Sequence, residues 1–177
     1  MQGDIKSLLV KGLGKKATTE LALRANSDTA FYELLLASIK TGEQTPAMKA
    51  SWIIGTAARL DAAPAQAHAG ALFKLLKAAS IGGVQRELLK TLEVVRFGDD
   101  IEGEFVDYCF QLIRKPGIDV GIRYYCLRIL QKRSRKYPEL KDELCLILEE
   151  IQDWHNEVWK RHTFKARQKL SFQKRKK

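Results

Sequence analysis

The feature that most constrains this chain is a regular spacing between helix-like segments. Four segments each begin with a bulky residue followed by a polar, mostly cationic one: Met48-Lys49, Val84-Gln85, Ile122-Arg123 and Trp159-Lys160. Successive pairs are 36, 38 and 37 residues apart. A fixed period of this size is typical of stacked helix pairs, because one pair alone cannot bury its own apolar face. The spacing therefore predicts an array of helix pairs, an architecture that usually holds a partner.

Apolar residues recur at intervals of three and four along most of the chain, which indicates helices and argues against strands. Gly55 falls inside one of these helices, where glycine costs about 1 kcal/mol relative to alanine, so we expect a neighbouring helix to approach closely there. The expected helices occupy residues 27–41, 46–61, 64–79, 84–98, a segment opened by the acids of 99–104, a segment after Pro116-Gly117, 138–151 and 157–170, with weaker ones at 4–12 and 18–25.

These segments predict an all-α fold, an α-α superhelix of about four to five antiparallel helix pairs. We expect one domain over residues 1–170, in which 1–26 form an atypical amino-terminal cap and 155–170 a basic cap helix. Residues 171–177 have too little apolar surface to fold and are predicted to be a disordered tail. The amino terminus lacks the pattern of a signal peptide, and three cysteines without Cys-x-x-Cys pairing suit a reducing compartment. We therefore expect a soluble, cytoplasmic protein.

The net charge of +10 is concentrated at one end of the chain. Residues 155–177 hold nine lysines and arginines against the single acid Glu157, a net charge of +8. The first 154 residues therefore carry only +2. Any argument from the high isoelectric point concerns the carboxyl-terminal segment alone.

Several segments resemble the HEAT and armadillo-like repeat pattern. The best is Asp119-Val120-Gly121-Ile122-Arg123, which follows a leucine-rich helix and is similar to the Asp-x-x-Val-Arg start of a second helix. The segments around Leu72 to Gln85 and around Met48 to Gly55 match this pattern in part. The resemblance covers about residues 28–170, and it implies an all-α superhelix that binds partners.

A narrower resemblance is to small HEAT-like proteins of Bacteroidetes, which sometimes carry an "adenylosuccinate lyase" label. It rests on Ala50-Ser51-Trp52, on 120–130 and on Phe164-Lys165-Ala166-Arg167-Gln168-Lys169-Leu170. We do not carry that activity over. The lyase superfamily has a Gly-Ser-Ser-x-Met-Pro-x-Lys-x-Asn loop, and nothing in this sequence matches it.

Chemical motifs are weak in this sequence. His155 and His162 could share a helix face, but two ligands do not make a zinc site, and neighbouring cations repel a divalent ion. No Gly-x-Ser-x-Gly occurs, and no Ser or Cys stands beside a histidine in a strained turn. We therefore expect no catalytic residues, no cofactor and no metal, and the chain is interpreted as a non-enzyme.

We expect a macromolecular partner to bind a concave face built from the second helix of each pair. The candidate contact residues there are Lys49, Gln85, Arg86, Arg123, Arg128, Lys132 and Arg135. The partner is expected to be a protein, and no membrane contact is expected. The alternative is a nucleic acid, because basic residues mixed with aromatics contact phosphates and bases. Its candidate residues are Lys160, Arg161, Lys165, Arg167, Lys169, Lys174, Arg175, Lys176 and Lys177. A remote form of this alternative is a DNA-repair glycosylase, since some alkylpurine DNA glycosylases are built on repeats of similar architecture.

Two further interpretations stay open. The carboxyl-terminal cations can simply solubilise the end of the stack while Trp159, Ala166 and Leu170 cap it. A small ligand in the groove near Trp52 and Tyr124 is a third possibility, ranked last because aromatic stripes at helical spacing are usually core.

Overall fold

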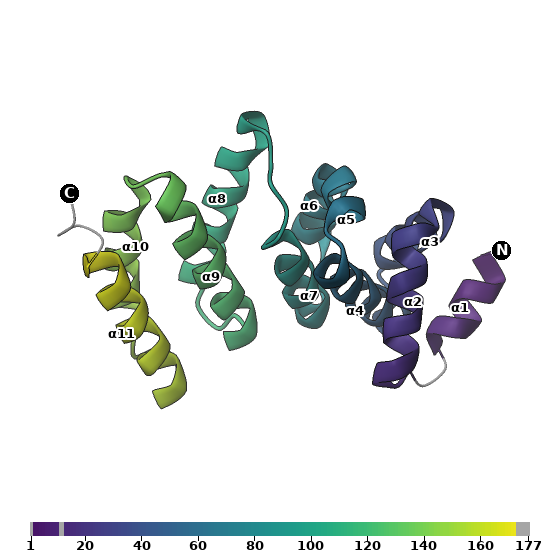
Figure 1. Cartoon of the computed structure of the whole chain (residues 1–177). Coiled ribbons are helices and arrows are strands. Elements are labelled where there is room, and N and C mark those ends of the chain that lie inside the picture. The colour runs from purple at the N-terminus through teal and green to yellow at the C-terminus, as the bar shows by residue number, and fades with distance from the viewer. Residues whose placement is uncertain (1, 11–12, 173–177) are drawn as a thin grey trace. The chain divides into compact units, whose positions relative to one another are not determined.

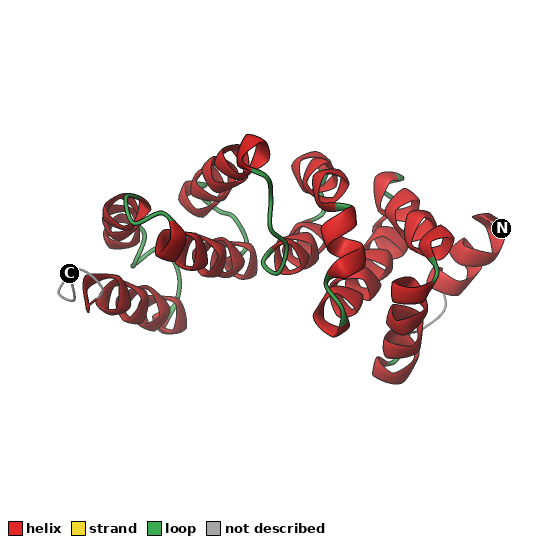
Figure 2. Ribbon diagram, turned by 45° about the horizontal axis from the view of Figure 1, so that its top comes forward, coloured by secondary structure: helices red, strands yellow, loops and turns green. Residues whose placement is uncertain are grey.

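A computed structural model describes residues 2–10 and 13–172, and within these ranges it contains eleven helices and no strand (Figures 1 and 2). The all-α fold class is thus confirmed. The helices are α1 (Gln2–Val10), α2 (Lys15–Ser27), α3 (Thr29–Lys40), α4 (Gln44–Leu60), α5 (Ala63–Ala67), α6 (Ala69–Ala78), α7 (Gly82–Leu92), α8 (Asp99–Arg114), α9 (Val120–Lys136), α10 (Leu140–Glu150) and α11 (Glu157–Phe172).

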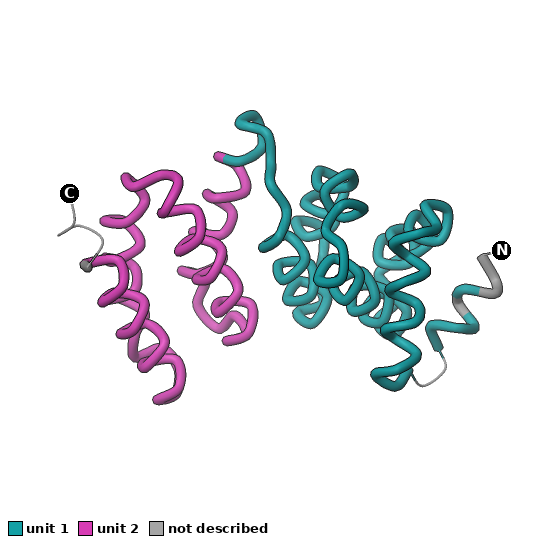
Figure 3. The backbone as a smooth tube through the Cα atoms, in the orientation of Figure 1, with its two compact units in different colours: residues 1–102 teal, residues 103–177 magenta. Residues whose placement is uncertain are grey.

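The helices form two compact units, 1–102 and 103–177, and the boundary falls inside α8 (Figure 3). The single domain expected over 1–170 stays a prediction. The predicted tail, 171–177, lies outside the described residues except for the last two positions of α11.

Helix α4 forms the centre of unit 1, because α1, α2, α3 and α7 all pack against it. Its apolar face is made largely of small residues, so that neighbouring helices can approach from several sides. Its fully buried side chains include Ala50, Ile53, Ile54 and Ala57.

Gly55 lies at a place where α4 and α7 approach closely. A methyl group added there would lie 3.1 Å from the carboxylate of Glu87 and 3.3 Å from the hydroxyl of Thr91, both on α7. The expected close approach of a neighbouring helix at Gly55 is therefore confirmed, and it explains a glycine in the middle of a helix.

A single residue, Asp28, separates α2 from α3. Its carboxylate accepts a hydrogen bond from the backbone N–H of Phe31 at 3.0 Å, so it caps α3 as the sequence pattern predicts. The guanidinium of Arg24 bonds the same carboxylate at 3.2 Å and lies 4.2 Å from the centre of the Phe31 ring. These contacts fix a sharp reversal of the chain within one residue.

Two helix boundaries differ from the expected ones. The helix expected over 64–79 is broken at His68, whose φ of −106° and ψ of 17° leave helical geometry. The His68 ring stacks on Tyr32 of α3 at 4.8 Å between ring centres, a contact that the local pattern does not reveal. The helix expected over 84–98 ends at Leu92, although Val95 and Phe97 beyond it are still buried.

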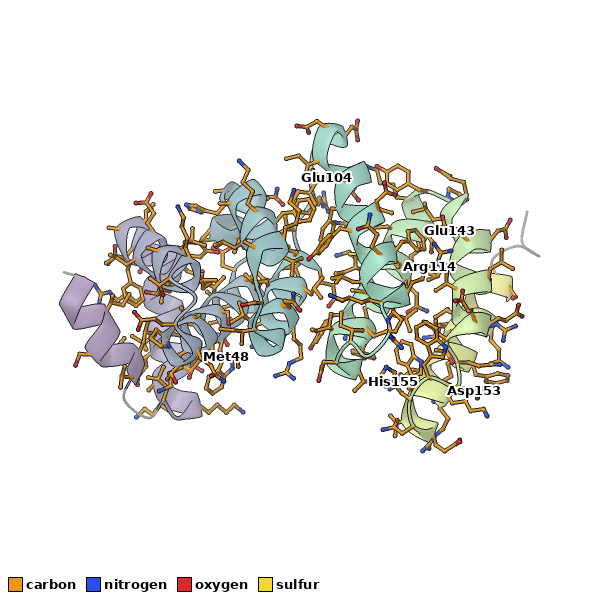
Figure 4. All side chains as sticks on the ribbon, turned by 180° about the vertical axis from the view of Figure 1, so that it is seen from behind. Met48, Glu104, Arg114, Glu143, Asp153 and His155 are labelled. Atoms are coloured by element: carbon orange, nitrogen blue, oxygen red, sulfur yellow. The ribbon has the colours of Figure 1, made fainter. Side chains whose placement is uncertain are left out.

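In unit 2, helix α9 packs against α10 and α11, and α10 packs against α11. Phe105 and Cys109 of α8 are buried. Four apolar residues of α10 and its carboxyl end are also fully buried, namely Leu144, Ile147, Leu148 and Ile151. Arg114 of α8 forms an ion pair with Glu143 of α10 at 3.3 Å (Figure 4).

Trp159 of α11 is among the largest fully buried side chains of the chain, at 1% exposure. Its indole N–H donates to the carbonyl of Ile151 at 2.9 Å, which anchors the start of α11 to the end of α10. Glu149, near the carboxyl end of α10, pairs with Arg167. Lys160, at the start of α11, pairs with Asp153 at 3.0 Å.

Candidate interaction surface

The charges of the last four helices alternate in sign from helix to helix. Helices α8 and α10 carry five and four acids, with one basic residue each. Helix α9 has six basic residues and no acid, and α11 has five basic residues and one acid. Since α9 and α11 contact each other, the two basic helices lie together on unit 2.

The sequence of unit 2 contains eighteen lysines and arginines against ten acids, whereas unit 1 contains thirteen against eleven. The excess charge therefore belongs to unit 2.

Arg128, Lys132 and Arg135 form an exposed stripe along α9. Their spacings of four and three residues place them on one face of the helix. The opposite face is apolar and buried through residues such as Ile129 and Leu130. The sequence prediction of a basic face on α9 agrees with this exposure.

Three aromatic rings lie at the amino-terminal end of this stripe. The Tyr124 ring meets the edge of Tyr125 at 5.6 Å and that of His162 from α11 at 5.0 Å between ring centres. The guanidinium carbon of Arg128 lies 5.9 Å from the centre of the Tyr124 ring. Because Tyr124 and Tyr125 are half-buried and His162 is exposed, this cluster reaches the surface where α9 and α11 meet.

The predicted cations of α11 differ in their surroundings. Lys165 and Lys169 are exposed, and they follow His162 at helical spacing on one face. The hydrogen bond that the ammonium of Lys160 donates to Asp153 raises the pKa of Lys160. The Nε of Arg161 donates to the carbonyl of Glu157 at 3.3 Å, and Arg167 is held by Glu149. Lys174, Arg175, Lys176 and Lys177 lie outside the described residues.

Arg123 is not available to a partner, and its expected role as a contact residue is wrong. Its side chain is 0% exposed, and its Nη2 donates to the carbonyl of Lys115 at 2.6 Å, just beyond the end of α8. The guanidinium carbon lies 4.9 Å from the ring centre of Trp154 and 5.9 Å from that of Trp159. Burial lowers the pKa of Arg123. This side chain joins the end of α8 to the start of α9 beneath two indole rings.

The contact residues predicted in unit 1 make contacts inside the unit. Lys49 donates to the carbonyl of Val10 at 3.1 Å, and Gln85 donates to the carbonyl of Ala79 at 2.6 Å. Arg86 is half-buried on α7. The exposed predicted contact residues therefore gather on α9.

His155 lies on the connection between α10 and α11, edge-on to the Trp159 ring at 5.9 Å (Figure 4). Burial lowers its pKa, and the positive charge of Arg123 lowers it further, whereas Asp119 acts in the opposite direction. Its Nε2 is buried and has no hydrogen-bond partner. The folded protein therefore favours the neutral imidazole.

This depressed pKa predicts a loss of stability on acidification. The unfolded chain binds a proton near the ordinary pKa of about 6.5, whereas the folded chain binds it only at lower pH, so stability is complete above about 6.5 and falls below it. We expect urea midpoints measured from pH 7.5 to 5 to fall less for His155→Gln than for the native chain. An identical fall in both proteins would contradict this prediction. His68→Gln is the matched control, because His68 is also a histidine at a helix boundary but belongs to unit 1.

Other parts of the structure offer little to a ligand. A cavity of about 250 Å³ in unit 1 is lined mainly by apolar atoms, from Ile5, Leu34, Ala37, Ser38, Thr41, Glu43 and Pro46. Trp52 and Tyr124, proposed for a small ligand, belong to different units. Among the described residues, no group of three or more His, Cys, Asp or Glu side chains is placed to hold a metal ion.

Sequence reasoning missed two features of this surface. Tyr125 and the ring contact between Tyr124 and His162 join α9 to α11, and only the packing of the two helices shows it. Arg133, which follows Lys132 of the exposed stripe in the sequence, is buried. Its position one residue beyond Lys132 places it on the inner face, which the helical period does indicate.

The helical repeat pattern has a match among known families. Residues 5–160 match the HEAT repeat domain family, which is well over half of the chain. No curated protein and no solved structure matches the chain. Nowhere in the described ranges is a helix both long and apolar enough to cross a membrane. This match covers most of the chain and shows that the chain belongs to the HEAT repeat domain family.

Proposed function

We propose that this chain is a non-catalytic interaction module that binds a macromolecular partner through the second helices of its pairs. The observation that supports this most is the exposed stripe of Arg128, Lys132 and Arg135 on α9. Helical repeat proteins use such surfaces to recognise extended partners by shape and side-chain complementarity. A protein partner is the first candidate, bound without a cofactor.

The test compares partner recovery by two matched triple variants. The first is Arg128→Gln, Lys132→Gln and Arg135→Gln, which removes the charge of the stripe. The second is Lys16→Gln, Lys40→Gln and Lys74→Gln, which removes three exposed charges from unit 1. We expect native chain and control to capture the same partner from cells of the native host, and the stripe variant to lose it. Equal recovery by both variants would contradict the proposal.

Nucleic acid is a second candidate, because the basic charge is segregated onto α9 and α11. Binding to a short duplex should then appear at ~50 mM salt. If six cations neutralise phosphates, affinity should fall by about 10³-fold by ~200 mM salt, since each contact contributes about 0.9 to the slope of log K against log salt. Undetectable duplex binding at ~50 mM salt would argue against a duplex as the partner.

A further inference from the structure

We propose that the surface where α9 meets α11 binds single-stranded nucleic acid, with Tyr124 as a stacking platform for a base. This inference rests on the second candidate function and narrows it to one class of ligand. The α9–α11 surface is defined here by Tyr124, Arg128, Lys132, His162, Lys165 and Lys169, all of unit 2.

The first support is the arrangement of cations in two rows. The short connections from α9 to α10 and from α10 to α11 reverse the chain twice, so α11 runs in the direction of α9 (Figure 1). The contact between Tyr124 and His162 sets these two positions side by side. Arg128 and Lys132 follow Tyr124 by one and two turns on α9. Lys165 and Lys169 follow His162 by one and two turns on α11, so the two rows of cations run in the same direction.

These two rows suit a flexible polyanion. Packed helix axes are about 8–10 Å apart, and each turn rises about 5.4 Å, so a single phosphodiester backbone can run along the helices with cations on both sides. Helix α9 contains no acid, and the acid of α11 is Glu157 at its first position, away from Lys165 and Lys169. The charged side chains of α9 are therefore all basic, and so are those of α11 beyond Glu157.

The second support is the ring cluster at one end of the rows. Tyr124, Tyr125 and His162 reach the surface and hold one another edge to face. Bases stack on such rings only when they are unpaired, because in a duplex their faces are covered by neighbouring base pairs. The guanidinium carbon of Arg128 lies 5.9 Å from the centre of the Tyr124 ring, so a cation stands directly beside the platform. Cations beside a ring platform favour a single strand over a duplex.

An acidic protein segment is the competing occupant, and it would use the cations without needing the rings. A stretch of aspartates and glutamates neutralises cations but presents no planar group to stack on Tyr124. Whether binding depends on the Tyr124 ring therefore distinguishes a single-stranded nucleic acid from an acidic protein segment.

The experiment measures the fluorescence anisotropy of a labelled 12-nucleotide oligo-U and a matched 12-base-pair duplex with the full chain at ~50 to ~200 mM salt. We expect the single strand to bind more tightly than the duplex. Tyr124→Ala should weaken single-strand binding about 5- to 100-fold without changing its salt dependence, and Tyr124→Phe should retain binding within about 2-fold. Arg128→Gln with Lys165→Gln should reduce the slope of log K against log salt by about 1.4, at about 0.7 per phosphate contact.

Tyr137→Ala is the matched control, since this ring also lies beneath a cation, Lys136 at 4.7 Å, but follows the end of α9. Urea midpoints of all variants show that they are folded. If Tyr124→Ala binds oligo-U as the native chain does, or if the duplex binds more tightly, the stacking inference is overturned and nucleic-acid binding stands. If neither probe binds at ~50 mM salt, both are overturned, and an acidic protein captured through Arg128 and Lys132 becomes the explanation of the surface.

Discussion

Replacing Trp159 by alanine is expected to lower the free energy of unfolding by about 3–5 kcal/mol, the largest effect of any single substitution that we predict. Its indole is 1% exposed, donates to the carbonyl of Ile151 and packs against both Arg123 and His155. Alanine leaves a cavity and removes one buried hydrogen bond. It also removes one of the two indole rings that contact the guanidinium of Arg123. The start of α11 would then lose its anchor to α10.

Urea unfolding followed by far-ultraviolet circular dichroism measures this loss. At slopes of about 1–3 kcal/mol per molar urea, the midpoint should fall by at least about 1 M. Trp154→Ala is the matched control, because Trp154 lies over the same guanidinium at 4.9 Å but is 39% exposed. We expect the control to cost about 1 kcal/mol. Similar losses in the two variants would show that burial of Trp159 is not what stabilises this end of unit 2.

Replacing Arg123 has a result that depends on the shape of the new side chain. Arg123→Ala is expected to cost about 2–4 kcal/mol, since it empties the space beneath Trp154 and Trp159. Arg123→Met keeps most of the volume and removes a buried charge whose Nε and Nη1 have no hydrogen-bond partner. The desolvation of that charge offsets its bond to Lys115 and its contacts with the rings, so methionine should stay within about 1 kcal/mol of the native chain.

The same urea titrations separate these outcomes. If methionine destabilises as much as alanine, the charge itself holds the end of α8 to the start of α9, and our account of Arg123 as a packing residue is wrong. His155 gives a second readout. Since the charge of Arg123 contributes to its depressed pKa, Arg123→Met should move the pKa of His155 upward, which nuclear magnetic resonance titration detects.

Much of the fold could be predicted because HEAT-type order is local. The period of about 37 residues, the cap at Asp28 and the close approach at Gly55 all depend on residues within one or two neighbouring helices. The break at His68 could not be predicted in the same way. It coincides with a ring contact to Tyr32, which belongs to an earlier helix pair, and the apolar period across the break is uninterrupted.

The candidate surface, too, could be predicted from the sequence only in part. The exposure of Arg128, Lys132 and Arg135 follows from the helical period, and the sequence alone indicates it. The burial of Arg123 does not, because arginine side chains are mostly exposed in folded proteins. Its burial depends on Trp154 and Trp159 from the next helix pair. The exposure of a basic side chain is predicted wrongly from the sequence when the residues that cover it come from another helix pair.

Because basic residues gather on α9 and α11 and acids on α8 and α10, we expect positive electrostatic potential beside α9 and α11. A polyanion approaching from solution would be turned by this field before it touches the protein, with its charge toward α9 and α11. The association rate constant should therefore respond to ionic strength more strongly than the dissociation rate constant. Partner selection would then begin at a distance of about one Debye length, which is about 10 Å at 0.1 M salt.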